Sequence, residues 1–425
     1  MEERGVDARH GTAFDLLHGL YRAMVDAADP ARVLPAQLPD LREGPAIVIG
    51  AGKAAASMAA AFDRVWAGPV SGFVVTPYGH AMPAGRVSVR EAAHPLPDDA
   101  ALAAGTDMLA LAERAARERR QLVCLLSGGA SSLACVPPPG ISLSAKRQVV
   151  AVLLRSGAEI SEINCVRKHL SLFKGGRLAQ AAWPAPVLCL AISDVPGDDP
   201  AVIGSGPLSP DPSTRADARA VLERFAIEVP HAVQAWLADP ASESPKATLG
   251  HVDYRLIATP GAALAAAVAR ARAIGFEVLD LGPDITDDAG ELGRAHAAIA
   301  MARLTSGWRG LIVSGGETRV RVGGAGRGGR NTEYLAALVS TLTPGADIAG
   351  FAADTDGMDG SGGAGAWFDP RILVRAHAAA GSIESFIRTS DTHGFFATLG
   401  AALPAAPTRT NVNDFRAILV GAGSV

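Results

Sequence analysis

The sequence predicts an α/β protein with a parallel sheet, and two observations support this fold class. Short apolar runs without polar alternation recur along the chain, among them residues 46–50, 71–77 and 121–129. Strands of this kind are covered on both faces, as in parallel sheets. Stretches with helical periodicity separate the runs, as repeated βαβ units require. The length of 425 residues predicts two domains.

The first half of the chain holds most of these patterns. An apolar stripe predicts a helix over residues 11–36, and an alanine-rich helix starts at Lys53. A further helical pattern covers residues 98–119, and a fourth buried strand covers residues 185–194. Residues 201–239 are expected to be mostly turn and helix.

The polar stretch at residues 239–250 is the best linker candidate, since it contains two prolines and two serines. We therefore expect an N-terminal domain over residues 1–240 and a C-terminal domain over residues 250–425. A second α/β pattern follows the linker. Its expected elements are strands at 254–260, 276–282, 310–322, 348–357 and 415–421, with helices from 261 to 275 and over 331–341.

Composition and charge exclude several classes of protein. The net charge is -4 and no basic run is interleaved with aromatic residues, so nucleic acid is not an expected partner. No apolar stretch reaches the roughly 18 residues of a membrane span, and the N-terminus lacks the apolar run of a signal peptide. The four cysteines are scattered, which fits a reduced, cytoplasmic protein.

Lysine is scarce in this chain. Of 39 basic residues only five are lysines, namely Lys53, Lys146, Lys168, Lys174 and Lys246. This skew fits the coding bias of a GC-rich genome, and a lysine that persists indicates a need for a compact ammonium group. Lys146 and Lys246 lie outside the motifs described below, and we expect them to be ordinary surface residues.

The first motif, VIGAGKAAASMA at residues 48–59, places glycines between a strand and a helix. It is similar to a dinucleotide fingerprint, because glycines let the backbone approach an anion at a helix N-terminus. NAD binding also requires an acid at the end of the next strand, where this chain has Thr76 and Pro77. Lys53, expected in the first helical turn, is either a solvated surface residue or a ligand for phosphate or carboxylate. We favour the second interpretation.

Two further segments of the first half suit an anionic ligand. LLSGGASSL at residues 125–133 offers unobstructed N–H groups and three serines, although it is also typical of an ordinary tight turn. NCVRKHLSLFKGGRLA at residues 164–179 concentrates basic side chains in an acidic protein. This segment is either a solvated helix face or the lining of a cleft for an anionic substrate.

Acidic loops follow strands in both halves. The segment LAISDVPGDDPAVIGSGP at residues 190–207 delivers Asp194, Asp198 and Asp199 at the end of a buried strand, where open α/β sheets bind ligands. Such carboxylates suit Mg²⁺ or deprotonation of a hydroxyl, or else cap helices and turns. Residues 314–334 and 352–367 combine glycine loops with acids and arginines. Together the loops predict a cleft between two α/β domains that holds a polyanion and a metal.

Seven segments, in order and spanning residues 50–420, resemble the glycerate 2-kinase family, whose members have a C-terminal MOFRL domain. The segments are GAGKAAASM, LLSGGASSL, NCVRKHLSLFKGGRLA, ISDVPGDDPAVIGSGP, VSGGETRVRVGGAGRGGRN, AADTDGMDGSGGAGA and TNVNDFRAILV. The resemblance implies a Rossmann-like N-terminal domain with a mostly parallel sheet and a smaller C-terminal domain with a mixed sheet. The active site is expected in the cleft between them.

The reaction implied by the resemblance is transfer of the ATP γ-phosphoryl group to the 2-hydroxyl of D-glycerate, with Mg²⁺. The family's key lysine, aspartate and arginine match Lys53, Asp194 and Arg330. Asp194 and Asp198 are candidate Mg²⁺ ligands. The residues expected to bind substrate or phosphate come from the same motifs and are Gly52, Ser127, Gly128, Gly129, Ser131, Ser132, Asn164, Arg167, Lys168, Gly315, Gly316, Glu317, Asp356 and Asn413.

Two other functions stay open at this point. Some members of the family carry the label hydroxypyruvate reductase, which implies NAD(P)H as cofactor, but the missing ribose acid argues against that activity. The other alternative is a non-catalytic sensor that binds glycerate or nucleotide. We expect small-molecule substrates, no membrane partner, and a monomer or homodimer.

Overall fold

The computed structural model describes residues 12–38, 43–247, 249–379, 382–421 and 423. Its contacts divide the chain into two compact units. We call Asp29–Ala258 the parallel-sheet unit, and Thr259–Val425 together with Met1–Ala28 the mixed-sheet unit. Each unit contains one six-stranded sheet, so the predicted fold class is confirmed.

The sheet of the parallel-sheet unit has the strand order β3-β2-β1-β4-β5-β6, and all neighbouring strands run parallel. This is the strand order of the Rossmann fold. The three central strands are buried along their whole length or nearly so, as their unbroken apolar sequences predict. The strands are β1 (Ala46–Ala51), β2 (Val70–Pro77), β3 (Ser88–Ala92), β4 (Gln121–Leu126), β5 (Val187–Ile192) and β6 (Val252–Ala258).

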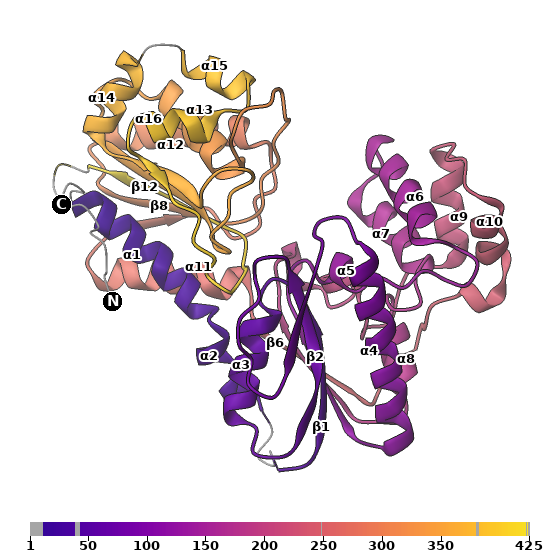
Figure 1. Ribbon diagram of the computed structural model, residues 1–425. Helices are drawn as coiled ribbons and strands as arrows, with labels where there is room; N and C mark the ends of the chain where they lie inside the picture. Colours follow the sequence, from indigo (N-terminus) through magenta and orange to yellow (C-terminus); the bar gives the residue numbers. More distant parts are fainter. Residues whose placement is uncertain (1–11, 39–42, 248, 380–381, 422, 424–425) are drawn as a thin grey trace. The chain divides into compact units, whose positions relative to one another are not determined.

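Helices cover both faces of this sheet (Figure 1). Helices α4 and α8 contribute to one core together with β1, β4 and β5, while α3 lies on the other face (Figure 1). The helices of the unit are α2 (Pro30–Val33), α3 (Ala55–Val65), α4 (Asp99–Glu118), α5 (Ala130–Leu133), α6 (Leu143–Arg155), α7 (Ile160–His169), α8 (Arg177–Ala182), α9 (Arg215–Arg224) and α10 (His231–Ala238), with short 3₁₀ turns η1 (Pro35–Gln37), η2 (Pro196–Asp198), η3 (Ile203–Ser205) and η4 (Pro240–Ser242).

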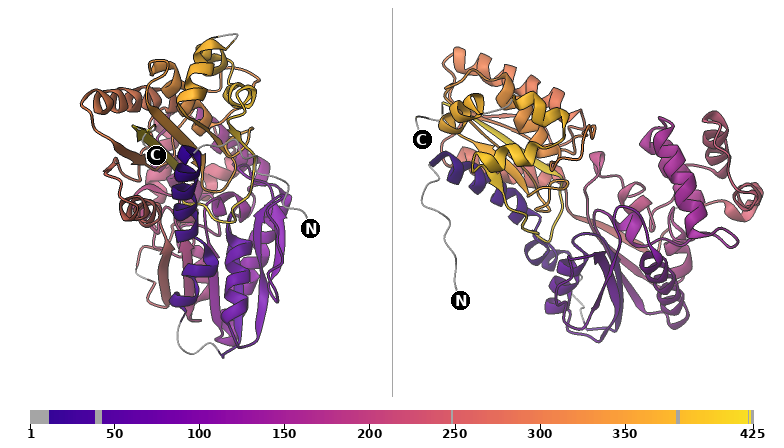
Figure 2. Two further views of the ribbon diagram at one scale, coloured as in Figure 1. Left: turned by 90° about the vertical axis from the view of Figure 1, so that its left-hand side faces the viewer. Right: turned by 45° about the horizontal axis from the view of Figure 1, so that its top comes forward.

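Four helices of this unit form a separate cluster beside the sheet. Helices α6, α7, α9 and α10 gather at one end of the unit (Figures 1 and 2). They share a small core of their own, which includes Leu153, Val166, Leu222 and Leu237. The cluster carries Arg167 and Lys168 on α7, so its packing positions the basic segment that the sequence singles out.

The sheet of the mixed-sheet unit has the order β11-β10-β9-β12-β8-β7. Only β7 and β8 pair in parallel, and the other pairs are antiparallel. Helices α1 and α11 lie on one face, and α12 and α13 lie on the other (Figure 1). The elements are α1 (Thr12–Ala27), α11 (Pro260–Ala273), β7 (Val278–Asp280), α12 (Ala289–Thr305), β8 (Gly310–Ser314), α13 (Arg330–Thr341), β9 (Ile348–Asp354), β10 (Gly365–Phe368), α14 (Pro370–Ala378), α15 (Ile383–Arg388), α16 (Thr392–Thr398), β11 (Ala402–Leu403) and β12 (Asp414–Val420).

The contacts place two segments differently from the expected domains 1–240 and 250–425. Helix α1 belongs to the mixed-sheet unit, where Tyr21 packs against Phe351 and donates a hydrogen bond to the carbonyl of Asp354 over 3.0 Å. Strand β6 follows the polar stretch 239–250 but pairs with β5 in the first sheet. The expected helix over 11–36 ends at Ala27, and a new short helix starts at Pro30, because proline cannot continue a helix in its interior.

None of the helices in the described part of the chain has both the length and the hydropathy that crossing a membrane requires.

Candidate functional site

Loops rich in small residues follow β1 and β4 at the point where the strand order reverses. From β1 the chain proceeds to β2 on one side of the sheet, whereas β4 lies on the other side. In open α/β sheets ligands bind outside the carboxyl ends of the strands at this switch point. The residues there are Gly52–Ala54 after β1 and Ser127–Gly129 after β4.

Backbone and side-chain hydrogen bonds fasten these two loops to each other. The N–H of Lys53 donates to the carbonyl of Gly128 over 2.8 Å, and the N–H of Ala54 donates to Oγ of Ser127 over 3.0 Å. Ser127 is fully buried. Its hydroxyl therefore positions the β1 loop, and the predicted role of Ser127 in binding substrate or phosphate stays a prediction.

The sequence predicted Lys53 in the first turn of a helix. In the structure Lys53 precedes α3 instead. The helix begins at Ala55, because Gly52 adopts φ +138° and the chain turns before the helix starts. The half-buried Lys53 side chain passes over the β4 loop, since a Cβ built on Gly129 would lie 3.7 Å from its Cγ. The same Cβ would lie 3.0 Å from Nε2 of the exposed His94, which is not among the predicted site residues.

Ser131 on α5 joins the β4 loop to the basic segment. Nη2 of Arg167 donates to Oγ of Ser131 over 2.5 Å, while Nη1 donates to Oδ1 of Asn164 over 3.0 Å. Oγ of Ser131 also lies 2.9 Å from Oγ of Ser205. The structure thus brings together three predicted residues, Ser131, Asn164 and Arg167. It adds Ser205, which belongs to the segment LAISDVPGDDPAVIGSGP at residues 190–207.

Ser132 and Lys168, also predicted for the site, have partners within the protein. Oγ of Ser132 donates to the carbonyl of Gly129 over 3.0 Å. Nζ of the buried Lys168 donates to Oδ1 of Asp211 over 3.2 Å, and the charge of Lys168 helps to lower the pKa of Asp211, against the effect of burial. Lys168 therefore compensates a buried carboxylate, and its role in binding substrate stays a prediction.

Asp194 and Asp198 follow β5, the next strand along the same edge of the sheet. Both are half-buried. Asp198 has φ +56°, and its Oδ1 is buried without a hydrogen-bond partner in the described structure. The described residues contain no group of three or more His, Cys, Asp or Glu side chains arranged to hold a metal ion. Two carboxylates are nevertheless enough for Mg²⁺ when substrate phosphates supply the remaining ligands.

In the mixed-sheet unit Arg330 is the first residue of α13 and is surrounded by carboxylates. Its Nε donates to Asp414 over 2.9 Å, its Nη2 donates to Asp354 over 2.6 Å, and its Nη1 lies 3.2 Å from Glu317. Burial disfavours the charge of Arg330, but the three carboxylates outweigh burial and raise its pKa. Glu317 has a half-exposed side chain (51%), whereas those of Asp354 and Asp414 are buried. Glu317 is therefore the partner that an incoming anion can displace.

Other predicted residues of this unit shape the same loops. The carbonyls of Gly315 and Gly316 accept hydrogen bonds from Arg416 over 2.6 and 2.9 Å. Oδ1 of the buried Asp356 accepts from the N–H of Met358 over 2.8 Å. Asn413 has φ +66°, and its Nδ2 is buried without a hydrogen-bond partner in the described structure.

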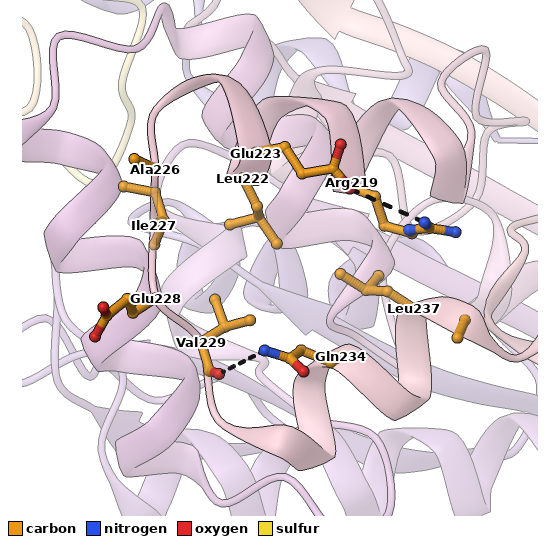
Figure 3. A pocket seen from close by; sticks show the side chains of 10 residues that line it. Arg219, Leu222, Glu223, Ala226, Ile227, Glu228, Val229, Gln234 and Leu237 are labelled. Atoms are coloured by element: carbon orange, nitrogen blue, oxygen red, sulfur yellow. Dashed lines mark hydrogen bonds and ion pairs between the residues drawn. The ribbon is translucent and has the colours of Figure 1, made fainter.

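A pocket elsewhere on the parallel-sheet unit has a different character. It has a volume of about 670 Å³ and lies between α9 and α10 (Figure 3). Leu222, Ile227 and Val229 line it together with Glu223 and Glu228 (Figure 3). Arg219 also lines the pocket, 3.9 Å from Glu223, so the lining carries two carboxylates against one guanidinium and does not favour a phosphate or a carboxylate ligand. We therefore assign the candidate site to the loops at the sheet edge.

The fold and these loops define a class, that of α/β proteins with glycine-rich loops at the switch point of a Rossmann-order sheet. Residues 16–238 match a family described as a domain of unknown function, DUF4147, and residues 310–414 match the MOFRL family. A D-glycerate 2-kinase of Thermotoga maritima is 36% identical over 403 residues, which cover 93% of this chain and 95% of the relative. The chain belongs to the glycerate 2-kinase family, which confirms the resemblance seen in the sequence.

Two more comparisons agree on the extent of the likeness. The crystal structure of a glycerate kinase from Thermotoga maritima matches with a TM-score of 0.87 at 34% identity, covering 96% of this chain and 99% of that chain. A protein of Agrobacterium vitis named "Putative hydroxypyruvate reductase" is 43% identical over 418 residues, covering 96% of this chain and 95% of the relative. The likeness therefore extends over both units. The location of the active site in a cleft between the domains stays a prediction.

Proposed function

We propose that this protein is an ATP-dependent D-glycerate 2-kinase, which forms 2-phospho-D-glycerate and ADP. The observation that carries the proposal is the pair of small-residue loops at the switch point, together with Lys53 beside them. The N–H groups of Gly52, Lys53 and Ala54 have acceptors within the protein, so the β4 loop would offer N–H groups at Gly128 and Gly129 to phosphates, and Lys53 would offer its ammonium group. The names of the relatives from Thermotoga maritima agree with this reaction.

The residues of the parallel-sheet unit suit phosphoryl transfer, which depends mainly on positioning and on neutralising charge. The loop from Gly128 to Ser131 would hold oxygens of a phosphate or of glycerate, and Lys53 would neutralise charge on the migrating group. Asp194 and Asp198 would hold Mg²⁺ carried on ATP, because Oδ1 of Asp198 is buried without a partner in the described structure. When bound, Mg²⁺ would supply positive charge to the phosphates.

Arg330 would bind an anionic group of a substrate from the mixed-sheet unit. Its guanidinium is oriented by the buried Asp354 and Asp414, and the half-exposed Glu317 would give way to the anion. A bidentate contact between a guanidinium and a phosphate or carboxylate is strong and directional.

The alternative function is an NAD(P)H-dependent hydroxypyruvate reductase, which the name of the Agrobacterium vitis relative favours. Against it, β2 ends at Thr76 and Pro77, so the strand itself does not supply the carboxylate that would bind a ribose. A sensor that binds glycerate or nucleotide without turnover is the third possibility.

One pair of assays tests these functions. The protein is incubated with ATP, Mg²⁺ and D-glycerate, and ADP is measured by chromatography. A parallel incubation with hydroxypyruvate and NADH or NADPH follows the absorbance of the reduced cofactor. We expect ADP release that depends on D-glycerate and no reductase activity. Reduced cofactor consumed without ADP release would refute the kinase, and binding without either reaction would indicate a sensor. Added enolase then identifies the product, because enolase accepts 2-phosphoglycerate and not the 3-isomer.

A further inference from the structure

Three cationic side chains converge on α5 and the turn after it without any carboxylate to compensate them. Lys146 and Lys174 are buried, with 4% and 1% of their surface exposed, and Arg167 is half-buried. Nζ of Lys174 donates to the carbonyl of Ser131 over 2.5 Å and to that of Ala134 over 3.3 Å. Arg167 binds Oγ of the same Ser131. None of the three cations forms an ion pair with a carboxylate of the described residues.

Lys146 is the least satisfied member of this group, and its burial overturns the expectation that it is a surface residue. Its Nζ is buried and has no hydrogen-bond partner in the described structure. Burial lowers the pKa of Lys146, and the charge of Arg167 lowers it further, although the Cys135 thiol opposes this effect. Burial also lowers the pKa of Lys174, as do the charges of Lys146 and Arg167. The three cations therefore lie close enough to repel one another.

Lys168, Arg330 and Arg416 have carboxylate partners, whereas the buried Arg177 donates to the carbonyl of Ser242. Lys168 has Asp211, and Arg330 has Asp354 and Asp414. A buried charge without a partner is costly, and even buried ion pairs can often be replaced by apolar side chains without loss of stability. Two of the five lysines of an arginine-rich chain stand at this costly position. A ligand that brings negative charge would explain why they are there.

We propose that Lys146, Arg167, Lys174 and Ser131 form the subsite for the carboxylate of the acceptor substrate. This inference rests on the proposed function. Arg167 and Ser131 are half-buried, so a ligand can reach them, while the two lysines neutralise its charge from behind. A carboxylate fits the forked guanidinium of Arg167. Ser131 lies two residues after Gly129, where a built Cβ would lie 3.7 Å from Cγ of Lys53, so a carboxylate bound here would hold the hydroxyl of a small acid on the Lys53 side of the loop.

The test uses the full chain and the variants Lys146→Met and Lys174→Met, with Lys246→Met as the control. Lys246 is exposed, as the sequence predicted, and binds Glu243 on the surface. The KM for D-glycerate and the KM for ATP are measured by ADP release. Thermal unfolding is followed without ligand and with D-glycerate, inorganic phosphate or glycerol. Arg167→Gln is a further variant at the half-buried edge of the subsite, in case a core variant fails to fold.

We expect the two lysine variants and Arg167→Gln to raise the KM for D-glycerate at least tenfold, with the KM for ATP changed less than twofold. Lys146→Met should unfold at the same temperature as the wild type or higher, because it removes an uncompensated charge. A purely structural lysine would give the opposite, a lower unfolding temperature and an unchanged KM. D-glycerate, but not glycerol, should stabilise the wild type more than the variants.

The outcomes separate this subsite from the proposed function. Kinase activity with an unchanged KM for D-glycerate in the folded variants would refute the subsite and leave the kinase intact. If the wild type releases no ADP, the proposed kinase activity is refuted, and the subsite is then tested by the shift in unfolding temperature alone. A shift with D-glycerate that Lys146→Met abolishes would support the subsite, and an equal shift in both proteins would refute it. Stabilisation by inorganic phosphate but not by D-glycerate would overturn the assignment to a carboxylate.

Discussion

Gly52 lies so close to Ser127 that position 52 has no room for a side chain. A Cβ built on Gly52 would lie 2.1 Å from Oγ of Ser127 and 2.6 Å from its carbonyl oxygen. Gly52 also adopts φ +138°, a conformation that residues with a side chain rarely adopt. The close approach of the two loops therefore depends on the absence of a side chain at Gly52 as well as on the hydrogen bonds between the loops.

We predict that Gly52→Ala lowers kcat/KM for D-glycerate by about 100-fold, because a displacement of about 1 Å in a positioning loop costs this much. Steady-state ADP release measures the effect. Gly79→Ala is the matched control, since Gly79 also has positive φ, at +80°, but a Cβ there meets nothing within 4 Å. The control should lose only about 1 kcal/mol of stability and keep its activity. Equal activities of the two variants would contradict the role of the loop.

Lys53→Met should lower kcat by about 1000-fold, which is the scale of removing one charge that stabilises the transition state. The unfolding temperature should stay close to that of the wild type, because Lys53 is half-buried and lies outside the helix. Lys53→Arg tests the compact ammonium group and should recover only part of the activity. A kcat near that of the wild type in Lys53→Met would remove Lys53 from the mechanism.

The sheet edge could be predicted from the sequence because its signals are local. Unbroken apolar runs mark β1, β4 and β5, and each run is followed at once by small or acidic residues. The conformation of the loops could not be predicted from the sequence in the same way. The first turn of α3 starts two residues after Lys53, because the positive φ of Gly52 delays the helix, and no propensity encodes that angle.

Other features depend on contacts between distant parts of the chain. Strand β6 is half-exposed and follows a polar stretch, so its sequence does not show that it pairs with β5. Lys146 resembles a surface lysine on an amphipathic helix, and only the packing of α6 beside Cys135 buries it. Asp414 and Arg416 alternate along β12, a pattern that does not reveal that both are buried and bind each other over 2.8 Å.

Asp414 is the centre of a buried ionic network and should be important for stability. It accepts hydrogen bonds from Arg330, from Nδ2 of Asn331 over 2.8 Å and from Arg416 over 2.8 Å. Asp414→Asn leaves two buried guanidinium groups with less compensation, so we expect a loss of about 3–5 kcal/mol in the free energy of unfolding. Urea unfolding measures it. The control is Asp347→Asn, where a more exposed carboxylate lies 3.9 Å from Arg309 and the expected loss is below about 1 kcal/mol.

Glu333 on α13 should make the stability of the protein depend on pH. Burial raises the pKa of Glu333 to about 7, with a contribution from the charge of Asp288. The ordinary value in an unfolded chain is about 4.3. As the pH rises between these two values, the unfolded chain loses the proton while the folded protein keeps it, so the free energy of unfolding falls through this window and levels off above it.

Glu333→Gln removes this titration and keeps the shape of the side chain. The variant should gain stability relative to the wild type as the pH rises from about 4 to about 8, by about 3 kcal/mol in total. Urea unfolding at a series of pH values measures the difference, in which the other titrating groups cancel. Glu277→Gln, at an exposed position of the same unit, is the control and should show no such trend. A difference between Glu333→Gln and the wild type that is constant with pH would show that Glu333 titrates alike in the folded and unfolded chains.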